Sequence, residues 1–249
     1  MLEVDDLSVT YQGFRLGPVS FRLDGGALLS LIGTNGSGKS TLIRAILGLN
    51  RVAGGTCRLD GMPTARRALA SIGVIGYVSD SSRDVLGEFT AREYWNYCLL
   101  AYSRARGVSV SEGLERAEHF AELLDFPLAQ RKPLSALSLG TSRKAQIIGA
   151  LVSSPRLLIL DEPFIGLDFI AARALEALLI ELRDDGMTVI ASSHDLDLAS
   201  RIADQLVVLH DGRPIVNATV AEIGGHEHLE PTVRNGLAAV RRQSRRPVP

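Results

Sequence analysis

The chain alternates short apolar runs with longer amphipathic segments, an order typical of α/β proteins. Residues 2–10 and 19–23 alternate apolar and polar side chains, as strands with one solvated face do. Four continuous apolar runs, expected to be strands buried on both faces, occupy residues 27–32, 72–78, 157–161 and 188–192. Shorter strands are expected at 56–59, 205–210 and 214–217, the last two as a hairpin around Asp211-Gly212.

Helical periodicity predicts three segments between two of these buried strands, at about 91–102, 111–125 and 142–153. Because one helical stripe cannot bury every aromatic side chain of the first segment, two interpretations stay open. The aromatics form the lobe's own core, or Leu86, Phe89 and one helix face form a socket for a short helix of a membrane partner. The aromatic residues are Phe89, Tyr94, Trp95, Tyr97 and Tyr102.

One glycine-rich segment, residues 33–41, fits the pattern G-x-x-x-x-G-K-[ST] of a phosphate-binding loop. It follows the apolar run 27–32 and precedes residues 42–47, whose leucines and isoleucines recur at helical spacing. This order directs backbone N–H groups and a positive helix end at an anion. Lys39 is expected to reach the β- and γ-phosphates of a nucleoside triphosphate, and Ser40 to bind Mg²⁺. The nucleotide-binding candidates are Gly33, Thr34, Asn35, Gly36, Ser37, Gly38, Lys39, Ser40 and Thr41.

Polar residues at strand ends supply further candidates for phosphate chemistry. The apolar run 157–161 ends in Asp161, a position at which P-loop proteins hold Mg²⁺. Glu162 comes next and is placed to orient or deprotonate an attacking water. His194 follows another strand and either contacts the γ-phosphate or is satisfied by a polar neighbour. Tyr11 either stacks on a purine base or caps the end of the first strand.

Composition adds few constraints. The 249 residues are 46% apolar with a net charge of −1, which fits one domain with a substantial core and indicates no general affinity for nucleic acid. Cys57 and Cys98 lack metal-ligand spacing and fit a reducing compartment. The chain shows no signal-peptide pattern and no apolar run of the roughly 18 residues that span a bilayer. Arginines near the end favour a solvated, partly flexible tail over contact with lipid headgroups or RNA: Arg234, Arg241, Arg242, Arg245 and Arg246.

Taken together, residues 1–220 resemble the nucleotide-binding subunit of an ATP-binding cassette (ABC) transporter. Tyr11 matches the family's base-stacking aromatic, residues 165–168 resemble the loop that crosses between subunits, and Ser193-His194-Asp195 resembles the switch histidine. The resemblance implies an α/β fold: a P-loop NTPase (RecA-like) core with a mixed sheet, an N-terminal antiparallel β-subdomain and a helical signature subdomain at about 85–153. Residues 221–249 would form a basic, partly flexible tail.

Two segments depart from the family pattern. The family's signature is usually LSGGQ, and the corresponding residues here are Leu137 followed by Ser138-Leu139-Gly140-Thr141. Leu139 replaces a glycine and Thr141 replaces a glutamine. The kept hydroxyl and helix N-terminus can still meet the ATP of a partner subunit. Where many members carry a glutamine after Tyr77-Val78, this chain has Ser79-Asp80. Asp80 can bond a metal-bound water, and by resemblance a carboxylate here is common among two-component bacterial exporters.

The resemblance implies an ATPase that uses ATP and Mg²⁺ in a head-to-tail dimer of identical or different ATPase subunits. Glu162 would orient water for attack, while Lys39 and His194 stabilise the developing charge. A separate transmembrane permease subunit would hold the chain at the cytoplasmic face of the membrane, with no nucleic-acid partner. Two alternatives remain: a soluble ABC ATPase that drives assembly, of the iron–sulfur scaffold type, or repair, and a nucleotide-binding regulator that does not hydrolyse ATP.

Overall fold

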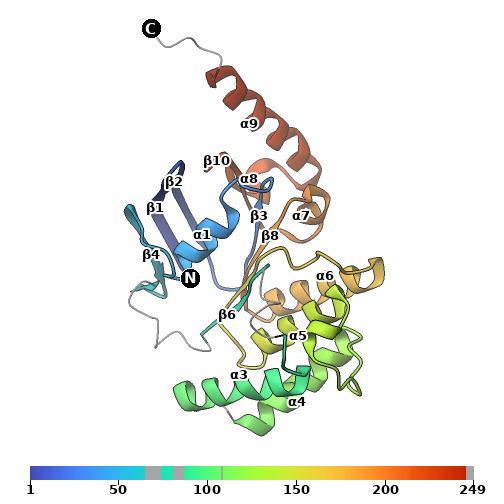
Figure 1. Ribbon diagram of the computed structural model, residues 1–249. Coiled ribbons are helices and arrows are strands. Elements are labelled where there is room, and N and C mark those ends of the chain that lie inside the picture. Colours follow the sequence, from blue (N-terminus) through green and yellow to red (C-terminus); the bar gives the residue numbers. More distant parts are fainter. Residues whose placement is uncertain (65–73, 81–86, 108, 245–249) are drawn as a thin grey trace. The chain divides into compact units, whose positions relative to one another are not determined.

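The computed structural model describes residues 1–64, 74–80, 87–107 and 109–244 (Figure 1). The chain divides into two compact units. The terminal unit comprises Met1–Arg66 and Ser192–Pro249, and the middle unit comprises Arg67–Ala191. Some sequence predictions fall outside the described residues: the start of the strand at 72–78, the socket residue Leu86, and Arg245 and Arg246 of the tail.

The terminal unit contains an antiparallel sheet with the strand order β2-β1-β4-β5, which confirms the expected N-terminal β-subdomain. Gly13 has a φ of 82°, a conformation that glycine adopts freely, and it closes a two-residue turn in which Tyr11 pairs with Phe14. The second strand therefore begins at Phe14, five positions before the predicted start. The strands are β1 (Leu2–Tyr11), β2 (Phe14–Leu23), β4 (Gly54–Leu59) and β5 (Met62–Pro63).

A second group of strands in the terminal unit is mixed in direction. The fully buried strand β3 (Leu28–Ile32) pairs in parallel with β9 (Gln205–His210). β9 pairs antiparallel with β10 (Arg213–Thr219), as the predicted hairpin requires. Helix α1 (Lys39–Ile46) follows β3, and α7 (Leu196–Ile202) precedes β9. This strand–loop–helix order positions the glycine-rich loop at the carboxyl end of a buried strand.

Most of residues 220–244 form helices, in the part of the chain where the sequence suggested a basic, partly flexible tail. They are α8 (Val220–Ile223), the 3₁₀ helix η3 (His226–His228) and α9 (Leu229–Ser244), the red helix of Figure 1. Leu229 is completely buried. Gly236 lies so close to β10 that a Cβ there would be 2.9 Å from the carbonyl oxygen of Ile215. α9 therefore packs within the terminal unit, and the domain limit at residue 220 stays a prediction.

The middle unit contains a parallel arrangement in which β7 (Leu157–Leu160) pairs with β6 (Ile75–Val78) on one side and β8 (Thr188–Ser193) on the other. All four side chains of β7 are fully buried, as its continuous apolar run predicts. Helix α6 (Phe169–Asp184) buries the leucine stripe expected from its sequence: Leu175, Leu178, Leu179 and Leu182.

Three helices form the predicted lobe of the middle unit, with a short 3₁₀ helix, η2 (Leu134–Ala136), before the last. Trp95 and Tyr94 are buried, and the Trp95 Nε1–H donates to the carbonyl oxygen of Ala145 at 2.9 Å. Tyr97 is 59% exposed, so the aromatics serve partly as core and partly as surface. The helices are α3 (Ala91–Arg106), α4 (Val110–Leu123) and α5 (Leu139–Leu151). None of the helices in the described residues is long and apolar enough to cross a bilayer.

Candidate nucleotide-binding site

The glycine-rich loop turns tightly at the end of β3 because its glycines adopt conformations that side chains would prevent. Gly36 and Gly38 have φ values of 80° and 109°, in the left-handed region. A Cβ on Gly33 would lie 2.3 Å from Ser37 Oγ and 2.7 Å from the carbonyl oxygen of Leu209. Gly38 is the N-cap of α1. The loop backbone therefore wraps around the positive end of that helix.

Lys39 lies within the loop and is only 6% exposed. Its Nζ donates to the carbonyl oxygen of Gly33 at 2.6 Å and lies 3.5 Å from that of Thr34. Thr34, Asn35 and Gly36 are exposed, while Ser40 and Thr41 in the first turn of α1 are half-buried. The loop thus combines a cation, accessible backbone and a helix N-terminus, an arrangement suited to phosphate.

Contacts from distant segments support this loop. The Gly33 N–H donates to the carbonyl oxygen of Ser193 at 3.2 Å, and the Gly212 N–H donates to that of Ser37 at 3.0 Å. The carbonyl oxygen of Gly212 accepts from Gly17 N–H at 2.7 Å. The β9–β10 turn therefore joins the loop to β2. Sequence analysis found this turn but missed its contact with the loop, because no local pattern reports a contact between distant segments.

A cavity of about 790 Å³ lies beside the loop within the terminal unit. Gly36 of the loop lines it, together with Phe14 and Arg15 of β2 and the turn residues Asp211 and Arg213. Its volume is in the range of small-molecule sites. The sequence singled out Tyr11, which is 48% exposed and pairs with Phe14 across the hairpin. Sequence analysis missed Phe14, whose ring end would lie 3.1 Å from a Cβ on Gly38.

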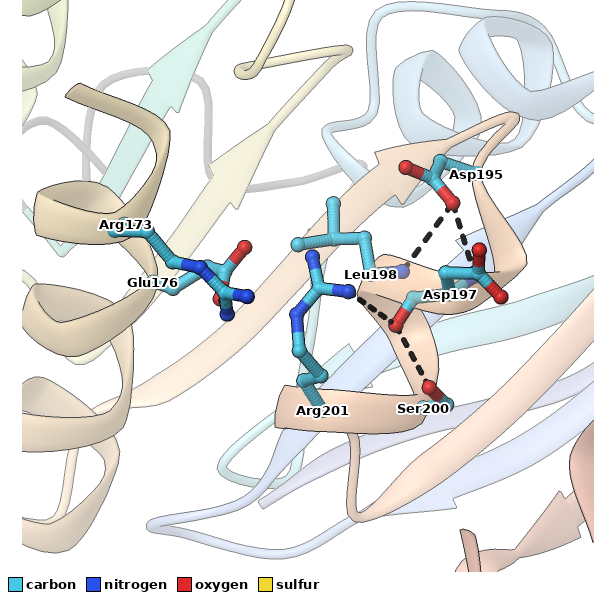
Figure 2. Close-up of polar contacts among 7 residues, drawn as sticks. All are labelled: Arg173, Glu176, Asp195, Asp197, Leu198, Ser200 and Arg201. Atoms are coloured by element: carbon cyan, nitrogen blue, oxygen red, sulfur yellow. Dashed lines mark hydrogen bonds and ion pairs between the residues drawn. The ribbon is translucent and has the colours of Figure 1, made fainter. Parts of the chain in front are cut away.

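His194 is exposed and lies between Ser193, the last residue of β8, and Asp195, the N-cap of α7. The Asp195 N–H donates to Ser193 Oγ at 2.9 Å. Figure 2 shows the Asp195 carboxylate capping α7, where Oδ1 accepts from the N–H groups of Asp197 at 2.9 Å and Leu198 at 3.3 Å. These hydrogen bonds hold the backbone beside His194 at the start of α7.

The paired carboxylates follow β7 in the middle unit. Asp161 is 1% exposed, and its N–H donates to the carbonyl oxygen of Val78 at 2.8 Å. Glu162 is 8% exposed and has a φ of 50°, which is uncommon for a residue with a side chain. Backbone strain of this kind costs of order 1–2 kcal/mol and gathers at functional positions. Because five other non-glycine residues of the described chain also have positive φ values, the proposed role of Glu162 rests on its position directly after Asp161 rather than on strain.

The altered signature forms the start of α5, three residues before the predicted helix. Ser138 is the N-cap: its Oγ accepts from Thr141 N–H at 3.1 Å and lies 2.8 Å from Thr141 Oγ1. Leu139 packs over Gly166, where a Cβ would lie 2.4 Å from Leu139 Cγ. A Cβ on Gly140 would lie 2.5 Å from the Gly166 carbonyl oxygen. The two replaced residues, Leu139 and Thr141, therefore make specific local contacts.

The candidate metal-binding side chains supply only oxygen atoms. They are the Ser40 hydroxyl of the terminal unit and the Asp161 and Asp80 carboxylates of the middle unit, of which Asp161 is buried and Asp80 exposed. Within the described residues, no three His, Cys, Asp or Glu side chains cluster as a metal site. This donor chemistry fits Mg²⁺, which proteins commonly hold through one or two side chains together with phosphate oxygens.

The two cysteines take no part in this chemistry. Burial raises the pKa of the Cys57 thiol to about 11. Burial likewise raises the pKa of Cys98 to about 11, although hydrogen bonds with Tyr94 and Tyr102 act in the opposite direction. Since the thiolate is the reactive form of cysteine, both side chains are inert, buried residues at neutral pH.

A buried strand, a glycine loop with its lysine and a helix on a mixed sheet define a P-loop nucleotide-binding protein. The family model "ABC transporter" matches residues 16–165. The chain belongs to this family.

Similar proteins carry related names. A putative ABC transporter ATP-binding protein of Listeria monocytogenes is 32% identical over 90% of this chain and 84% of its own length. Nod factor export ATP-binding protein I of Rhizobium etli is 35% identical over 92% of this chain and 72% of its own. A Bacillus cereus putative ABC transporter ATP-binding protein is 31% identical, and the chain spans only 40% of that relative's length.

Solved structures of ABC cassettes share the fold. The ATP-binding subunit of an ABC transporter aligns with a TM-score of 0.79 and 32% identity, covering 90% of this chain and 91% of that one. A dimeric cassette in a post-hydrolysis state, bound to ADP and Pi, aligns with a TM-score of 0.77 and 25% identity, covering 88% and 99%. These similarities agree with the α/β cassette fold expected from the sequence.

Proposed function

We propose that the chain is the ATP-binding and ATP-hydrolysing subunit that powers a membrane transporter. The observation that carries this proposal is the glycine loop, which holds Lys39 and presents exposed backbone at the N-terminus of α1. Such loops bind the phosphates of a nucleoside triphosphate. The coupling of ATP use to transport rests on family membership.

The proposed reaction uses the residues that the sequence motifs single out. Lys39 and the loop N–H groups bind the β- and γ-phosphates, and Glu162 orients a water for in-line attack. His194 stabilises the charge that develops on the γ-phosphoryl group. Ser40 and Asp161 would hold Mg²⁺, and the ion would neutralise part of the negative charge on the phosphates.

The second ATPase subunit would be an identical or related cassette arranged head to tail. In this arrangement, Ser138 and the N-terminus of α5 meet the γ-phosphate bound by the partner, with the contact extending over residues 138–141. Support comes from the exposed Ser138 hydroxyl and from the dimeric relative bound to ADP and Pi. Leu139, which lies against Gly166, and Thr141, whose hydroxyl bonds that of Ser138, stand where the family has glycine and glutamine.

We further propose that transport is export and that a separate transmembrane subunit binds the middle unit at the membrane surface. Export is supported by Asp80 and by the Rhizobium etli relative, which is named for export. The rings of Phe89 and Tyr97 lie 5.8 Å apart. Tyr97 is exposed, and Leu100, three residues further along α3 and so on the same side of the helix, is 54% exposed. These side chains are available to a partner, whereas Tyr94 belongs to the core.

Isolation of partners from native membranes with the Glu162→Gln protein, with and without ATP, tests the proposed function. A polytopic membrane protein should co-purify. Recovery of soluble partners alone would contradict the transporter assignment and favour an assembly or repair ATPase. Exchange of Tyr97 for alanine is expected to weaken recovery of the membrane subunit. Leu49→Ala, which removes another exposed apolar side chain, is the control outside the surface patch.

The nucleoside base is expected to stack on the ring of Tyr11 or of Phe14, which pair across the hairpin. Base–aromatic stacking contributes about 1–3 kcal/mol, so alanine at either position should weaken ATP binding by about 5- to 100-fold. Tripolyphosphate lacks a base, and its affinity should be unchanged. Calorimetry with both ligands checks this, with Tyr97→Ala as an aromatic control. Equal losses for ATP and tripolyphosphate would mean that the rings support the loop rather than the base.

A further inference from the structure

Arg143 is a buried cation on the helix that carries the signature. It is 3% exposed and lies in the second turn of α5, five residues after Ser138. Its Nη1 donates to the carbonyl oxygen of Ser79 at 2.6 Å, and its Nη2 donates to that of Asp80 at 3.2 Å. A buried guanidinium has to be compensated by acceptors, and hydrogen bonds from a charged donor are the stronger kind.

Residues just before α5 make similar hydrogen bonds to Gly87 and Phe89. Ser135 donates from both its N–H and its Oγ to the carbonyl oxygen of Gly87, at 3.0 and 2.9 Å. The Leu134 N–H donates to the carbonyl oxygen of Phe89 at 2.8 Å. Residues 134–143 therefore bond to the chain immediately before and after the segment that follows Asp80.

We propose that Arg143 is a positioning residue that fixes Asp80 relative to Ser138. Asp80 is exposed, and the bonds from Arg143 reach its backbone, which leaves the carboxylate available. Ser138 caps the helix on which Arg143 lies. Arg143 thus holds two groups at a set spacing. They are the Asp80 carboxylate, which approaches a metal-bound water, and the Ser138 hydroxyl, which approaches a partner's γ-phosphate. This inference rests on the proposed function, which assigns those roles to Asp80 and Ser138.

The test measures ATP affinity by calorimetry, with Mg²⁺ and with the metal chelated, in the full-length protein. Arg143→Met should reduce the gain in ATP affinity that Mg²⁺ gives by about tenfold, the effect typical of losing a partner that orients a metal-site residue. ATP affinity without metal should stay at the wild-type value, because the substitution leaves the phosphate loop and Lys39 unchanged. Combining Arg143→Met with Asp80→Ala should add little to the effect of Asp80→Ala alone.

Arg116→Met provides the matched control. Arg116 also bonds a backbone carbonyl within the middle unit, donating from Nε and Nη2 to Val152 at 3.0 and 2.7 Å. Its replacement should lower stability without changing the Mg²⁺-dependent gain. If Arg143→Met behaves in the same way, the inference is overturned, while the proposed function stands.

Arg143→Lys provides a second test that does not depend on folding of the methionine variant. One ammonium group cannot reproduce the two-pronged guanidinium, so an intermediate Mg²⁺-dependent gain is expected. A wild-type gain in this variant would overturn the positioning role. Loss of all ATP binding in the wild-type protein would instead overturn the proposed function itself.

Discussion

Replacement of Glu162 by glutamine is expected to lower ATP turnover by about 10²–10⁴-fold, the range that general-base catalysis contributes. Glutamine matches glutamate in size and can occupy the same buried position after β7, but it cannot take a proton from water. ATP affinity should therefore stay within about twofold of wild type, since the loop and Lys39 are untouched. Steady-state hydrolysis together with calorimetric ATP binding measures both quantities.

Glu181→Gln makes the same chemical change on the exposed face of α6 and is expected to leave turnover unchanged. A Glu162→Gln protein that hydrolyses ATP at near wild-type rate would exclude Glu162 as the base. A protein that loses ATP binding as well would show that the glutamine disturbs the strained backbone at this position.

Gly212→Ala is expected to destabilise the protein by about 3 kcal/mol and to weaken ATP binding about tenfold, through backbone strain and overpacking. Gly212 has a φ of 74°, and a Cβ there would lie 2.0 Å from the Arg15 carbonyl oxygen. The two nearest atoms, the carbonyl oxygen and carbon of Arg15, belong to the backbone, so the turn has to move away. Because Gly212 donates to Ser37, that movement displaces the phosphate loop. Urea unfolding and ATP calorimetry measure the two effects.

Gly61→Ala isolates the cost of the backbone conformation. Gly61 has a φ of 74° but no atom within 4 Å of its Cβ position. Its replacement should cost about 1 kcal/mol, the strain of a left-handed residue, without affecting ATP affinity. Equal unfolding energies for the two variants would contradict the steric argument for Gly212.

Local patterns in the sequence were sufficient to predict the α/β class and the order of strands and helices. The glycine loop was recognised because it combines a pattern of residues with a strand before it and a helix after it. Strand and helix starts were less well predicted. β2 begins at Phe14 because of the turn at Gly13, and α5 begins at Leu139 because Ser138 caps it. Each boundary depends on a single residue, and a prediction from hydrophobic periodicity takes no account of that residue.

The contacts that support the candidate site could not be predicted, because they join segments distant in sequence. In the sequence, Gly212 has the pattern of an ordinary turn glycine. Its hydrogen bond to the carbonyl oxygen of Ser37 is visible only in the structure. Arg143 lies among other polar residues at the start of a helix, and nothing in that pattern indicates its burial against Ser79. Tyr11 was singled out from its position after the first strand and from the family resemblance, and Phe14, which lines the cavity beside Gly36, was not considered.

The position of Trp95 gives the chain an intrinsic optical reporter. It is the single tryptophan of the sequence, it is buried, and its indole N–H bonds Ala145 on α5. Its ring also meets Phe126 edge-on at 5.4 Å. Because indole emission depends on polarity and hydrogen bonding around the ring, the native fluorescence of this protein follows the packing of α5 against α3. Motion of the signature helix can therefore be recorded in solution without attaching a dye.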